Sequence, residues 1–555
     1  MAVNPKKWEF AVSGEIRNVA LSGKGEYIAA TSSDNYLYFL NGSGDKLWEL
    51  NLEVEIVEMH ISITGDYLLA LSADNSVQLY DKEGKVLWSS KFSSVVGGTA
   101  ISSTAGYIVA GCEDGTVNLF TREGKGLWKY KCVGGVNDIS IAKDGSYIVA
   151  GDDEGNVYLL DLRGRFIWAY KTLGVIERVK LSGNGEYVFA SADDFRTYFF
   201  QRGGNLLWNP RNVEIVRHVD ISESGKKIIL AVGNEVYLLD ESGMVIKRFQ
   251  ALGLVLGVAI SMNGEYAVAS TTNNNVYFFD KVGELLWKFD ALGDCEAVAI
   301  DAQGDCVVGG SNDRRIYFFD NYNFFEGVIS LTKKNILDIK EFGVNTLEAD
   351  VLLNRAIAEV KRREYASAIT YAKGAESLAK RIKEKCKPEI SILVAVNEGF
   401  HLNHTQLLNI LTVNTGTAHA NNIKILLSGN IVVQEIEKIG ELQVGKYKTI
   451  QLQIKPTASG IIPVKLSASF HDLEGRSYLT ETIVDIAVGE AGKRTPYTKL
   501  QPIIKVGNVQ RLLTIASVKT SVEKEVIPDE YLCPKCKKTV KKEFLGCPYC
   551  FTKLR

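Results

Sequence analysis

Tryptophan recurs at a spacing of 40 residues in the first part of this chain of 555 residues. The series lacks a tryptophan at one place, where Lys247 stands 39 rather than 40 residues after Trp208. Around each place the same order repeats: four short β-rich segments bounded by Gly, Asn, Asp and Ser, as antiparallel hairpins require. Forty residues that contain four strands are typical of one blade of a β-propeller. The seven tryptophans are Trp8, Trp48, Trp88, Trp128, Trp168, Trp208 and Trp287.

The two ends of the repeat indicate how the ring closes. The chain begins with a lone fourth strand around Trp8, whereas the last unit has three strands, in EAVAI, CVVGG and RIYFF, and no fourth. The sequence therefore predicts an eight-bladed propeller over residues 1–326, in which the N-terminal strand completes the last blade. Such closure removes the exposed sheet edges that favour aggregation. An open arc of blades is the alternative.

The repeat resembles two known families. The segments VYLLDLRGRFIW, YLYFLNGSGDKLW and VYFFDKVGELLW resemble the pyrroloquinoline-quinone-type propeller repeat, in which the tryptophan packs against the neighbouring blade. Turns such as CEDGTVNLF are similar to those of WD-repeat proteins. The resemblance covers residues 6–325 and implies the fold rather than a function. Quinone-dependent dehydrogenases carry their ligands and catalytic acids in long insertions between blades. These repeats have no such insertion, so we expect no enzymatic activity.

The composition also limits the possible functions. A net charge of −2 gives no reason to expect nucleic acid or an acidic membrane as a partner of the whole molecule. The chain has only six histidines, which is a poor supply for acid–base chemistry. The N-terminal residues MAVNPKKWEF do not resemble a secretory signal, and no apolar stretch is long enough to span a membrane. Five scattered cysteines indicate reduced thiols, and we expect a cytoplasmic protein.

Positions at which the repeat is broken are the candidates for partner binding. The first strand of each blade lines the central channel, and charged side chains gather there in the second, fourth, fifth and sixth blades. Opposite charges in a narrow, wet channel can also simply pair with each other, which is the simpler interpretation. In the fifth blade, the turn in SADDFRTYFF leaves an aromatic ring and an arginine at a loop tip, as in many interface anchors. The candidates are Glu58, His60, Asp138, Arg178, Lys180, His218 and Asp220 in the channel, and Phe195 and Arg196 at the tip.

Residues 327–388 change to a helical period. Apolar residues recur every three or four positions from about Thr346, which predicts two amphipathic helices that end before Pro388. The segment EYASAITYAKGAESLA resembles a tetratricopeptide-type unit. A single helical hairpin cannot bury both of its faces. We therefore expect it to dock on the propeller, on the next domain or on a second subunit.

Residues 389–489 are rich in strands again. About seven alternating segments predict an immunoglobulin-like β-sandwich. The stretch VNTGTAHANNIKILLSG resembles the Ig-like modules of archaeal and bacterial proteins and, more distantly, adaptor appendage domains, which bind partners or act as spacers. Residues 490–530 are typical of a linker.

Residues 531–555 contain the most specific chemical motif. Cys533 and Cys536 form one CPxC pair, and Cys547 and Cys550 form a second. Four thiolates in two such pairs hold Zn²⁺ at tetrahedral corners, and no site stays open for water, so the sequence predicts one structural zinc ion in a zinc ribbon. An iron centre of the rubredoxin type is the alternative. The ribbon is rich in lysine, so nucleic acid is a possible contact as well as protein.

The sequence as a whole predicts a mainly β protein: an eight-bladed β-propeller, an α-helical hairpin, an Ig-like β-sandwich and a C-terminal zinc ribbon. The order of domains has an archaeal character but matches no single family. The expected function is a non-catalytic, cytoplasmic scaffold that binds protein partners and takes no small-molecule substrate. The alternative is a nucleic-acid- or ribosome-associated factor that contacts RNA or DNA through the basic ribbon.

Overall fold

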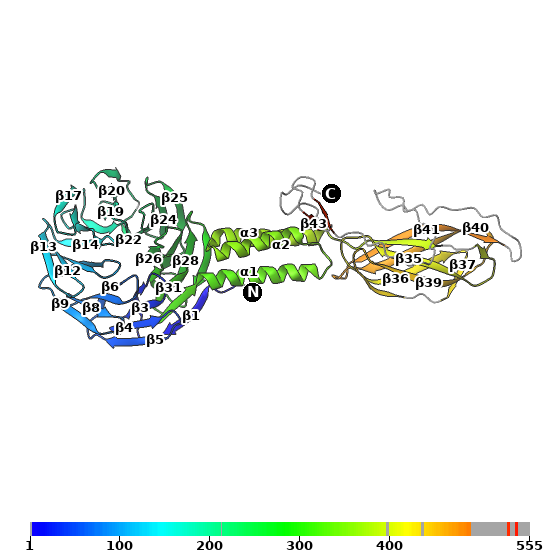
Figure 1. Ribbon diagram of the computed structural model, residues 1–555, viewed down its shortest axis with the longest axis horizontal. Helices are drawn as coiled ribbons and strands as arrows, with labels where there is room; N and C mark the ends of the chain where they lie inside the picture. Colours follow the sequence, from blue (N-terminus) through cyan, green and yellow to red (C-terminus); the bar gives the residue numbers. More distant parts are fainter. Residues whose placement is uncertain are drawn as a thin grey trace.

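The computed structural model describes residues 3–212, 214–395, 399–434 and 438–489, together with the short segments 530–532 and 539–541. Three parts follow one another along the chain in Figure 1: a propeller, a stalk of helices and a domain of two sheets. No helix in the described part of the chain is both long and apolar enough to cross a membrane.

The propeller contains eight four-stranded antiparallel sheets within the described residues Lys6–Asp320. The innermost strands are β2 (Ile16–Leu21), β6 (Ile56–Ile61), β10 (Val96–Ile101), β14 (Val136–Ile141), β18 (Ile176–Leu181), β22 (Val216–Ile221), β26 (Val255–Ile260) and β30 (Cys295–Ile300). The second strands are β3 (Tyr27–Ser32), β7 (Tyr67–Ser72), β11 (Tyr107–Cys112), β15 (Tyr147–Asp152), β19 (Tyr187–Ala192), β23 (Lys227–Val232), β27 (Tyr266–Thr271) and β31 (Cys306–Ser311). The third strands are β4 (Tyr36–Asn41), β8 (Ser76–Asp81), β12 (Thr116–Thr121), β16 (Asn156–Asp161), β20 (Thr197–Gln201), β24 (Glu235–Asp240), β28 (Asn275–Asp280) and β32 (Arg315–Asp320). The outer strands are β5 (Lys46–Asn51), β9 (Val86–Lys91), β13 (Gly126–Lys131), β17 (Phe166–Lys171), β21 (Leu206–Trp208), β25 (Val245–Gln250), β29 (Leu285–Asp290) and β1 (Lys6–Ala11).

The N-terminal strand β1 closes the ring. It pairs antiparallel with β32, with Trp8 opposite Phe318 and Phe10 opposite Ile316. The order of the last sheet is therefore β1-β32-β31-β30, with one strand from the start of the repeat and three from its end. The predicted pairing of the first strand with the last unit is confirmed, and β32 has a partner on both sides.

The tryptophans join neighbouring sheets. Trp168 donates its indole N–H to the carbonyl oxygen of Arg202, at 2.8 Å, in the next repeat. Its ring lies against Gly204, which has a φ of 87° and at which a Cβ would come within 3.0 Å of the indole. Because any side chain at this turn would displace the ring, glycine is required where the tryptophan of the preceding sheet docks. The same contact recurs around the ring, and Trp287 uses the side-chain oxygen of Asn321 instead of a backbone carbonyl.

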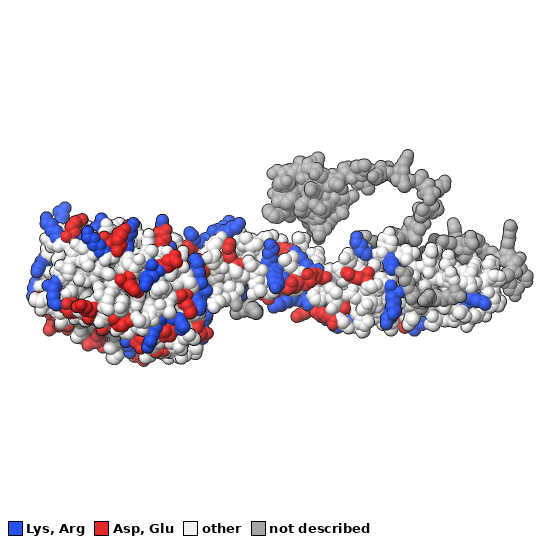
Figure 2. Space-filling view, turned by 90° about the horizontal axis from the view of Figure 1, so that it is seen from below, with Lys and Arg blue, Asp and Glu red and all other residues white. Residues whose placement is uncertain are grey.

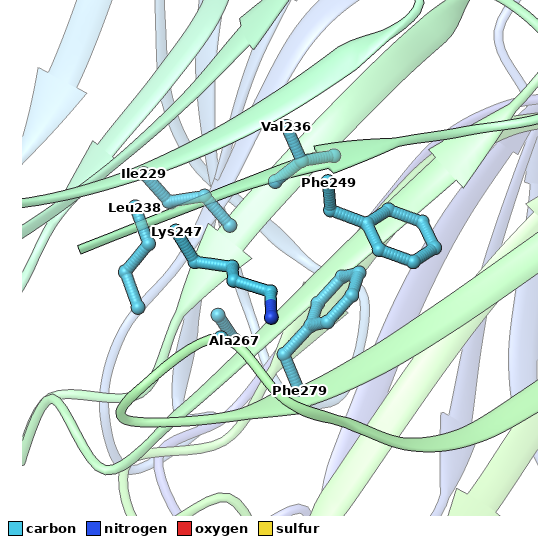
Figure 3. A pocket seen from close by; sticks show the side chains of 8 residues that line it. Ile229, Val236, Leu238, Lys247, Phe249, Ala267 and Phe279 are labelled. Carbon is cyan, nitrogen blue, oxygen red and sulfur yellow. The ribbon is translucent and has the colours of Figure 1, made fainter. Parts of the chain in front are cut away.

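Lys247 occupies the place of the missing tryptophan. It lies opposite Leu238 in the pairing of β24 with β25, as Trp287 lies opposite Phe278 in the next sheet. Its ammonium group pairs with Glu284 at 2.7 Å. The aliphatic stem leaves a small apolar hollow of about 10 Å³ (Figure 3). The hollow is lined by Ile229, Val236, Leu238, Lys247, Phe249, Ala267, Phe279 and Gly283.

We expect Lys247→Trp to stabilise the propeller by about 1 kcal/mol, because an indole can fill apolar space that the lysine stem leaves open. The lost ion pair with Glu284 is exposed and contributes little. The measurement is the urea midpoint followed by tryptophan fluorescence, which reports the propeller alone since all seven tryptophans lie in it. Lys247→Ala is the control and should leave the midpoint nearly unchanged. A lower midpoint for Lys247→Trp would show that the site cannot hold an indole.

The stalk has three helices, where the sequence predicts two. They are α1 (Asn321–Lys340), α2 (Leu347–Lys361) and α3 (Tyr365–Lys385). The prediction missed α1, which begins directly after β32, before the predicted boundary at 326. Its N-cap is Asp320, whose carboxylate accepts the backbone N–H of Asn323. The buried face of α1 includes Asn321 and Thr332, and these polar residues obscure its apolar period.

One end of the stalk docks on the last two sheets of the propeller. Asp305, in the turn between β30 and β31, accepts a hydrogen bond from the Tyr365 hydroxyl at 2.6 Å and pairs with Arg363 at 2.7 Å. The Tyr266 hydroxyl donates to the Arg363 carbonyl oxygen at 2.6 Å and accepts the Tyr365 backbone N–H at 3.0 Å. The Tyr365 ring, which is fully buried, stacks on Phe325 with 4.6 Å between ring centroids. The contact with the propeller therefore has a buried aromatic centre and a polar edge.

The other end of the stalk contacts the two-sheet domain. Lys383 of α3 pairs with Glu474 at 2.7 Å, and the backbone N–H of His419 donates to the carbonyl oxygen of Phe342 at 3.2 Å. The stalk thus lies between two β-rich parts and contacts both (Figure 1).

The second β domain has two sheets that share one hydrophobic core. Their strands are β33 (Ile390–Ala395), β34 (Phe400–His401), β35 (Gln406–Asn414), β36 (Ala420–Gly429), β37 (Ile431–Gln434), β38 (Ile439–Leu442), β39 (Tyr447–Pro456), β40 (Gly460–His471) and β41 (Ser477–Gly489). One sheet has the order β33-β35-β39-β37 and the other β34-β41-β40-β36-β38. Alternate residues of β39 and β40 are buried, as expected for strands with one face in a core.

Candidate functional site

The charged residues predicted to line the channel lie on the innermost strands. Glu58 and His60 belong to β6, and Asp138 belongs to β14. Arg178 and Lys180 belong to β18, and His218 and Asp220 belong to β22. Because β14, β18 and β22 are the innermost strands of consecutive sheets, five of the seven residues are brought into one sector of the channel.

The acidic side chains bond to the innermost strand of the next sheet. One carboxylate oxygen of Glu58 accepts the backbone N–H of Thr99 at 2.7 Å and its hydroxyl at 2.9 Å. Asp138 accepts the backbone N–H of Val179 at 2.8 Å. Each of these N–H groups belongs to the innermost strand of one sheet and bonds to an acid of the preceding sheet. The acids therefore link neighbouring sheets, because their carboxylates accept hydrogen bonds from backbone N–H groups that would otherwise be unpaired.

The remaining polar groups in the channel follow the same plan. Asp220 accepts the backbone N–H of Ile260 at 3.0 Å and lies 3.9 Å from the ammonium group of Lys180. The second carboxylate oxygen of Glu58 lies 3.2 Å from His60 Nε2. These pairings agree with the simpler interpretation, in which channel charges neutralise each other. Binding of a partner by the seven channel residues stays a prediction.

The basic groups of β18 and β22 are less firmly paired. Arg178 donates to the carbonyl oxygens of Arg217 and Glu177, at 3.3 and 3.0 Å. The backbone N–H of Val258 donates to His218 Nδ1 at 3.4 Å. The pKa of His218 is lowered, because desolvation and the neighbouring Lys180 disfavour the imidazolium form. A neutral ring can accept the Val258 hydrogen bond, which an imidazolium cannot.

Burial and bonding shift the acids in opposite directions. Burial raises the pKa of Asp138 to about 6, although Arg178 and the Val179 hydrogen bond act against it. Burial also opposes ionisation of Glu58, but His60 and the two hydrogen bonds from Thr99 outweigh it and leave the pKa of Glu58 below its ordinary value. The two acids therefore stay in different protonation states in mildly acidic solution.

We expect Asp138→Asn to stabilise the propeller at pH 8 and to have no such effect at pH 4. A carboxyl whose pKa is raised from 3.8 to about 6 on folding adds its full stability below pH 3.8, and this stability is lost progressively as the pH rises through 6. The neutral amide removes that loss and can still accept the Val179 N–H, for a gain of about 1 kcal/mol after allowance for partial exposure in the channel. The urea midpoint by tryptophan fluorescence at the two pH values measures it. The control is the exposed Asp144→Asn, and an equal effect of Asp138→Asn at both pH values would contradict the assignment.

Phe195 and Arg196 lie at a turn, as predicted, and the Arg196 side chain is held there by polar contacts. Phe195 has a φ of 65°, in the left-handed region where most other repeats have Gly or Asn and the last repeat has Arg314. The Arg211 guanidinium lies 6.0 Å from the centroid of the Phe195 ring, which is 36% exposed. Arg196 donates to the Asn209 carbonyl oxygen at 3.2 Å and lies 3.9 Å from Asp194. The aromatic ring is thus the more available of the two for a partner.

The predicted zinc ligands Cys533, Cys536, Cys547 and Cys550 lie outside the described residues. The first pair falls between two short strands, β42 (Glu530–Leu532) and β43 (Thr539–Lys541), which pair antiparallel. The zinc ribbon and its four ligands stay a prediction. Among the residues that the structure does describe, no group of three or more His, Cys, Asp or Glu side chains is placed to hold a metal ion.

The face of the molecule in Figure 2 shows no large patch of one sign on the propeller. Lysine and arginine are interspersed there with aspartate and glutamate. Sequence reasoning missed two features of the propeller. One is the cluster of Asp305, Arg363 and Tyr365 at the stalk, and the other is a set of exposed aliphatic loop tips. No local pattern marks the first, whereas the second could have been found by aligning the loops between repeats.

Two family models match parts of the propeller. One, described as a beta-propeller protein, matches residues 51–165. The other, the PQQ_2 repeat, described as outer membrane protein assembly factor BamB, matches residues 113–257. No curated protein matches the chain.

Among solved structures, the propeller is similar to Sqt1. Sqt1 from Chaetomium thermophilum, bound to the N-terminus of the ribosomal protein L10, is 15% identical with a TM-score of 0.50, over 57% of this chain and 100% of Sqt1. Sqt1 from Saccharomyces cerevisiae is 13% identical with a TM-score of 0.50, over 58% of this chain and 99% of Sqt1. At these identities the similarity concerns the fold alone. Residues Lys6–Asp320 thus form a β-propeller, and the predicted resemblance of its repeats to the pyrroloquinoline-quinone type is confirmed.

Proposed function

We propose that this protein is a non-catalytic scaffold that holds protein partners together in the cytoplasm. In this proposal each four-stranded sheet is one blade of an eight-bladed propeller, and the two-sheet domain is an Ig-like module. Residues 531–555 are a structural zinc ribbon. The domain boundaries are those that the sequence predicts, apart from the earlier start of the stalk at Asn321.

The observation that carries the proposal is the stalk between two β-rich parts. α3 has 21 residues, so it spans about 30 Å at 1.5 Å per residue. Its two ends contact different parts, through Tyr365 on the propeller and Lys383 on the two-sheet domain. A packed spacer of this kind sets the distance between two binding modules, which is what a scaffold requires (Figure 1).

The mode of binding is proposed by comparison with a propeller of the same fold. Sqt1 from Chaetomium thermophilum has been crystallised with the N-terminus of the ribosomal protein L10. We infer that the present propeller likewise accepts a short segment of a protein partner. Loops at the ends of blades suit such a role, because they vary without disturbing the strands that support them.

The test is affinity purification of the tagged full chain from cells of the source organism, beside a chain that ends at residue 529. A scaffold predicts defined protein partners in stoichiometric amounts that survive moderate salt. Recovery of RNA or DNA, with binding that falls steeply as salt rises and that needs residues 530–555, would support the nucleic-acid alternative instead. Enrichment of neither protein nor nucleic acid would overturn the proposal.

We expect the purified full chain to contain one equivalent of zinc. Cys533→Ser and Cys547→Ser should each abolish stoichiometric zinc, because a structural site needs all four thiolates. Elemental analysis after gel filtration measures the metal and separates zinc from iron. The control is Cys386→Ser, which changes a scattered cysteine of the stalk and should leave the zinc content at one. Full zinc occupancy in either single variant would contradict the ribbon.

A further inference from the structure

In the described part of the propeller, four loops between sheets have an aliphatic side chain at the tip that is exposed to solvent. Each loop leads from the outer strand of one sheet to the innermost strand of the next, and the tip residues are exposed by 80% (Val133), 82% (Leu173), 67% (Leu252) and 73% (Leu292). Together these four residues form the apolar arc. At the equivalent positions of the first three junctions the sequence has Ser13, Glu53 and Ser93. The arc therefore belongs to one part of the ring, and the repeat does not demand it.

Packing explains the residue after each tip but not the tip itself. A Cβ on Gly134 would collide with the side chain of Asp153, and a Cβ on Gly174 with Asp193. Glycine is needed there because the loop crosses closely over the turn between the second and third strands. The preceding Val133 and Leu173 reach no core. Since exposure of aliphatic side chains is unfavourable, four of them at matched positions indicate a surface that is covered in use.

The arc lies on the side of the propeller away from the contacts of the stalk. Its loops join at the start of the innermost strands, whereas the stalk contacts Asp305 in the turn at the end of the innermost strand β30. Strands of one blade run antiparallel across the ring, so these two sets of loops open on opposite faces. A ligand on the arc would not meet the stalk contact.

Acidic side chains flank the arc. Asp153 accepts the backbone N–H of Gly135 through one carboxylate oxygen, and Asp193 accepts that of Val175 in the same way, both at 2.8 Å. Within the described part of the chain, neither acid is in an ion pair, and nor is Asp294 beside Leu292. The cations of this rim pair with the neighbouring acids instead: Lys171 lies 4.0 Å from Glu154, and Arg196 lies 3.9 Å from Asp194. Carboxylates next to exposed leucines favour a ligand that is both aliphatic and cationic.

We propose that the apolar arc binds a basic, amphipathic segment of a protein partner, with aliphatic side chains between the loop tips and lysine or arginine against Asp153 and Asp193. The inference rests on the proposed scaffold function and names the chemistry of the partner. Phe195 lies in the turn that follows Asp193 and adds an aromatic ring at this rim. An anionic membrane is a poor alternative, because the carboxylates repel it.

The experiment measures the binding of a fluorescein-labelled 18-residue peptide of leucine and lysine to the full chain at physiological salt, by anisotropy. The same peptide with glutamate in place of lysine is the second probe. The arc variant carries Val133→Ser, Leu173→Ser, Leu252→Ser and Leu292→Ser. The matched control carries Leu47→Ser, Leu87→Ser, Leu127→Ser and Leu207→Ser, which remove equally aliphatic but regular residues of the outer strands, exposed by 41–47%.

We expect the lysine peptide to bind the wild-type chain and to lose at least tenfold in affinity on the arc variant, with less than a twofold change on the control. The double variant Asp153→Asn with Asp193→Asn should weaken binding of the lysine peptide severalfold, and the glutamate peptide should not bind.

Equal binding of the two peptides, or equal loss of affinity on the arc variant and the control, would overturn the proposal. A peptide of residues 491–521 tests whether the arc binds another part of the same chain. If this peptide bound through the arc, and bound the chain that ends at Gly489 more tightly than the full chain, the occupant would be the chain itself. The proposal of a separate partner would then be overturned. Unchanged thermal unfolding shows that the variants fold. Partners recovered from cells equally by wild type and arc variant would overturn the arc and leave the scaffold standing.

Discussion

A chain that lacks residues 1–11 is expected to lose at least about 4 kcal/mol of propeller stability and to associate in solution. The deletion removes β1, so the backbone groups of β32 that face it lose their partners over the whole strand. It also removes Trp8, whose ring stacks on Phe318 with 4.8 Å between centroids and whose indole bonds to Gly42 in the next sheet. Loss of one such packed ring alone costs about 3–5 kcal/mol. The measurements are the urea midpoint by fluorescence of the remaining six tryptophans and the mass by light scattering.

Addition of a peptide in trans provides the control for the closure of the ring. A synthetic peptide of residues 1–13 should restore the midpoint of the truncated chain and return it to the mass of the wild type. The same peptide with Trp8→Ala should restore much less, because it keeps the strand and loses the contact with the next sheet. An unchanged midpoint in the truncated chain would mean that an open arc of blades is stable by itself.

Tyr365→Ala is expected to release the stalk from the propeller, with a loss of about 3–5 kcal/mol in the stability of α3. The ring is fully buried between Phe325 and Tyr266, and its hydroxyl bonds to Asp305. Removal leaves a cavity at the centre of the contact and an acid with only Arg363 as partner. Hydrogen exchange of residues 365–385 measures the effect, since a released helix exchanges faster than a docked one.

Two other substitutions show whether the contact itself matters. Tyr365→Phe keeps the ring and should cost about 1.5–3 kcal/mol, the value of a hydrogen bond to a charged group. Tyr371→Ala removes a tyrosine from the same helix that is only partly buried, and it should have the smallest effect of the three. Equal acceleration of exchange by Tyr371→Ala and Tyr365→Ala would show that any large substitution in α3 releases it.

The propeller could be predicted because its elements are local. Each blade is closed by hairpins between neighbouring segments, and each turn carries its own Gly, Asn or Asp. The recurring glycines also report a contact over distance: Gly204 occurs where Trp168 of the preceding repeat must dock. The helix α1 was harder to predict, since Asn321 and Thr332 are buried through hydrogen bonds that are not visible in the sequence.

The candidate site was only partly predictable for the same reason. Sequence alignment of the repeats places Glu58 and Asp138 on channel strands, and the structure agrees. The alignment does not show that their carboxylates accept the backbone N–H groups of Thr99 and Val179, which lie 41 residues further along the chain. A charged residue at a position where other repeats have small residues is thus as compatible with a hydrogen bond between neighbouring blades as with a ligand site. Exposure, as for Leu173, is a property of the folded surface and had to be measured there.

Periodicity alone predicted the propeller and the N-terminal strand that closes it, because both depend on residues at a constant separation. The packing of each tryptophan on the neighbouring sheet was implied by the resemblance to the pyrroloquinoline-quinone-type repeat. The tertiary structure decided three further matters: that the stalk rests on the propeller, that the channel acids bond between sheets, and that four loop tips face solvent. The junction joins Tyr266, Asp305 and Tyr365, which are separated by up to 99 residues and follow no repeat. Their contact is decided by which surfaces meet when the ring has closed, and no local pattern records that.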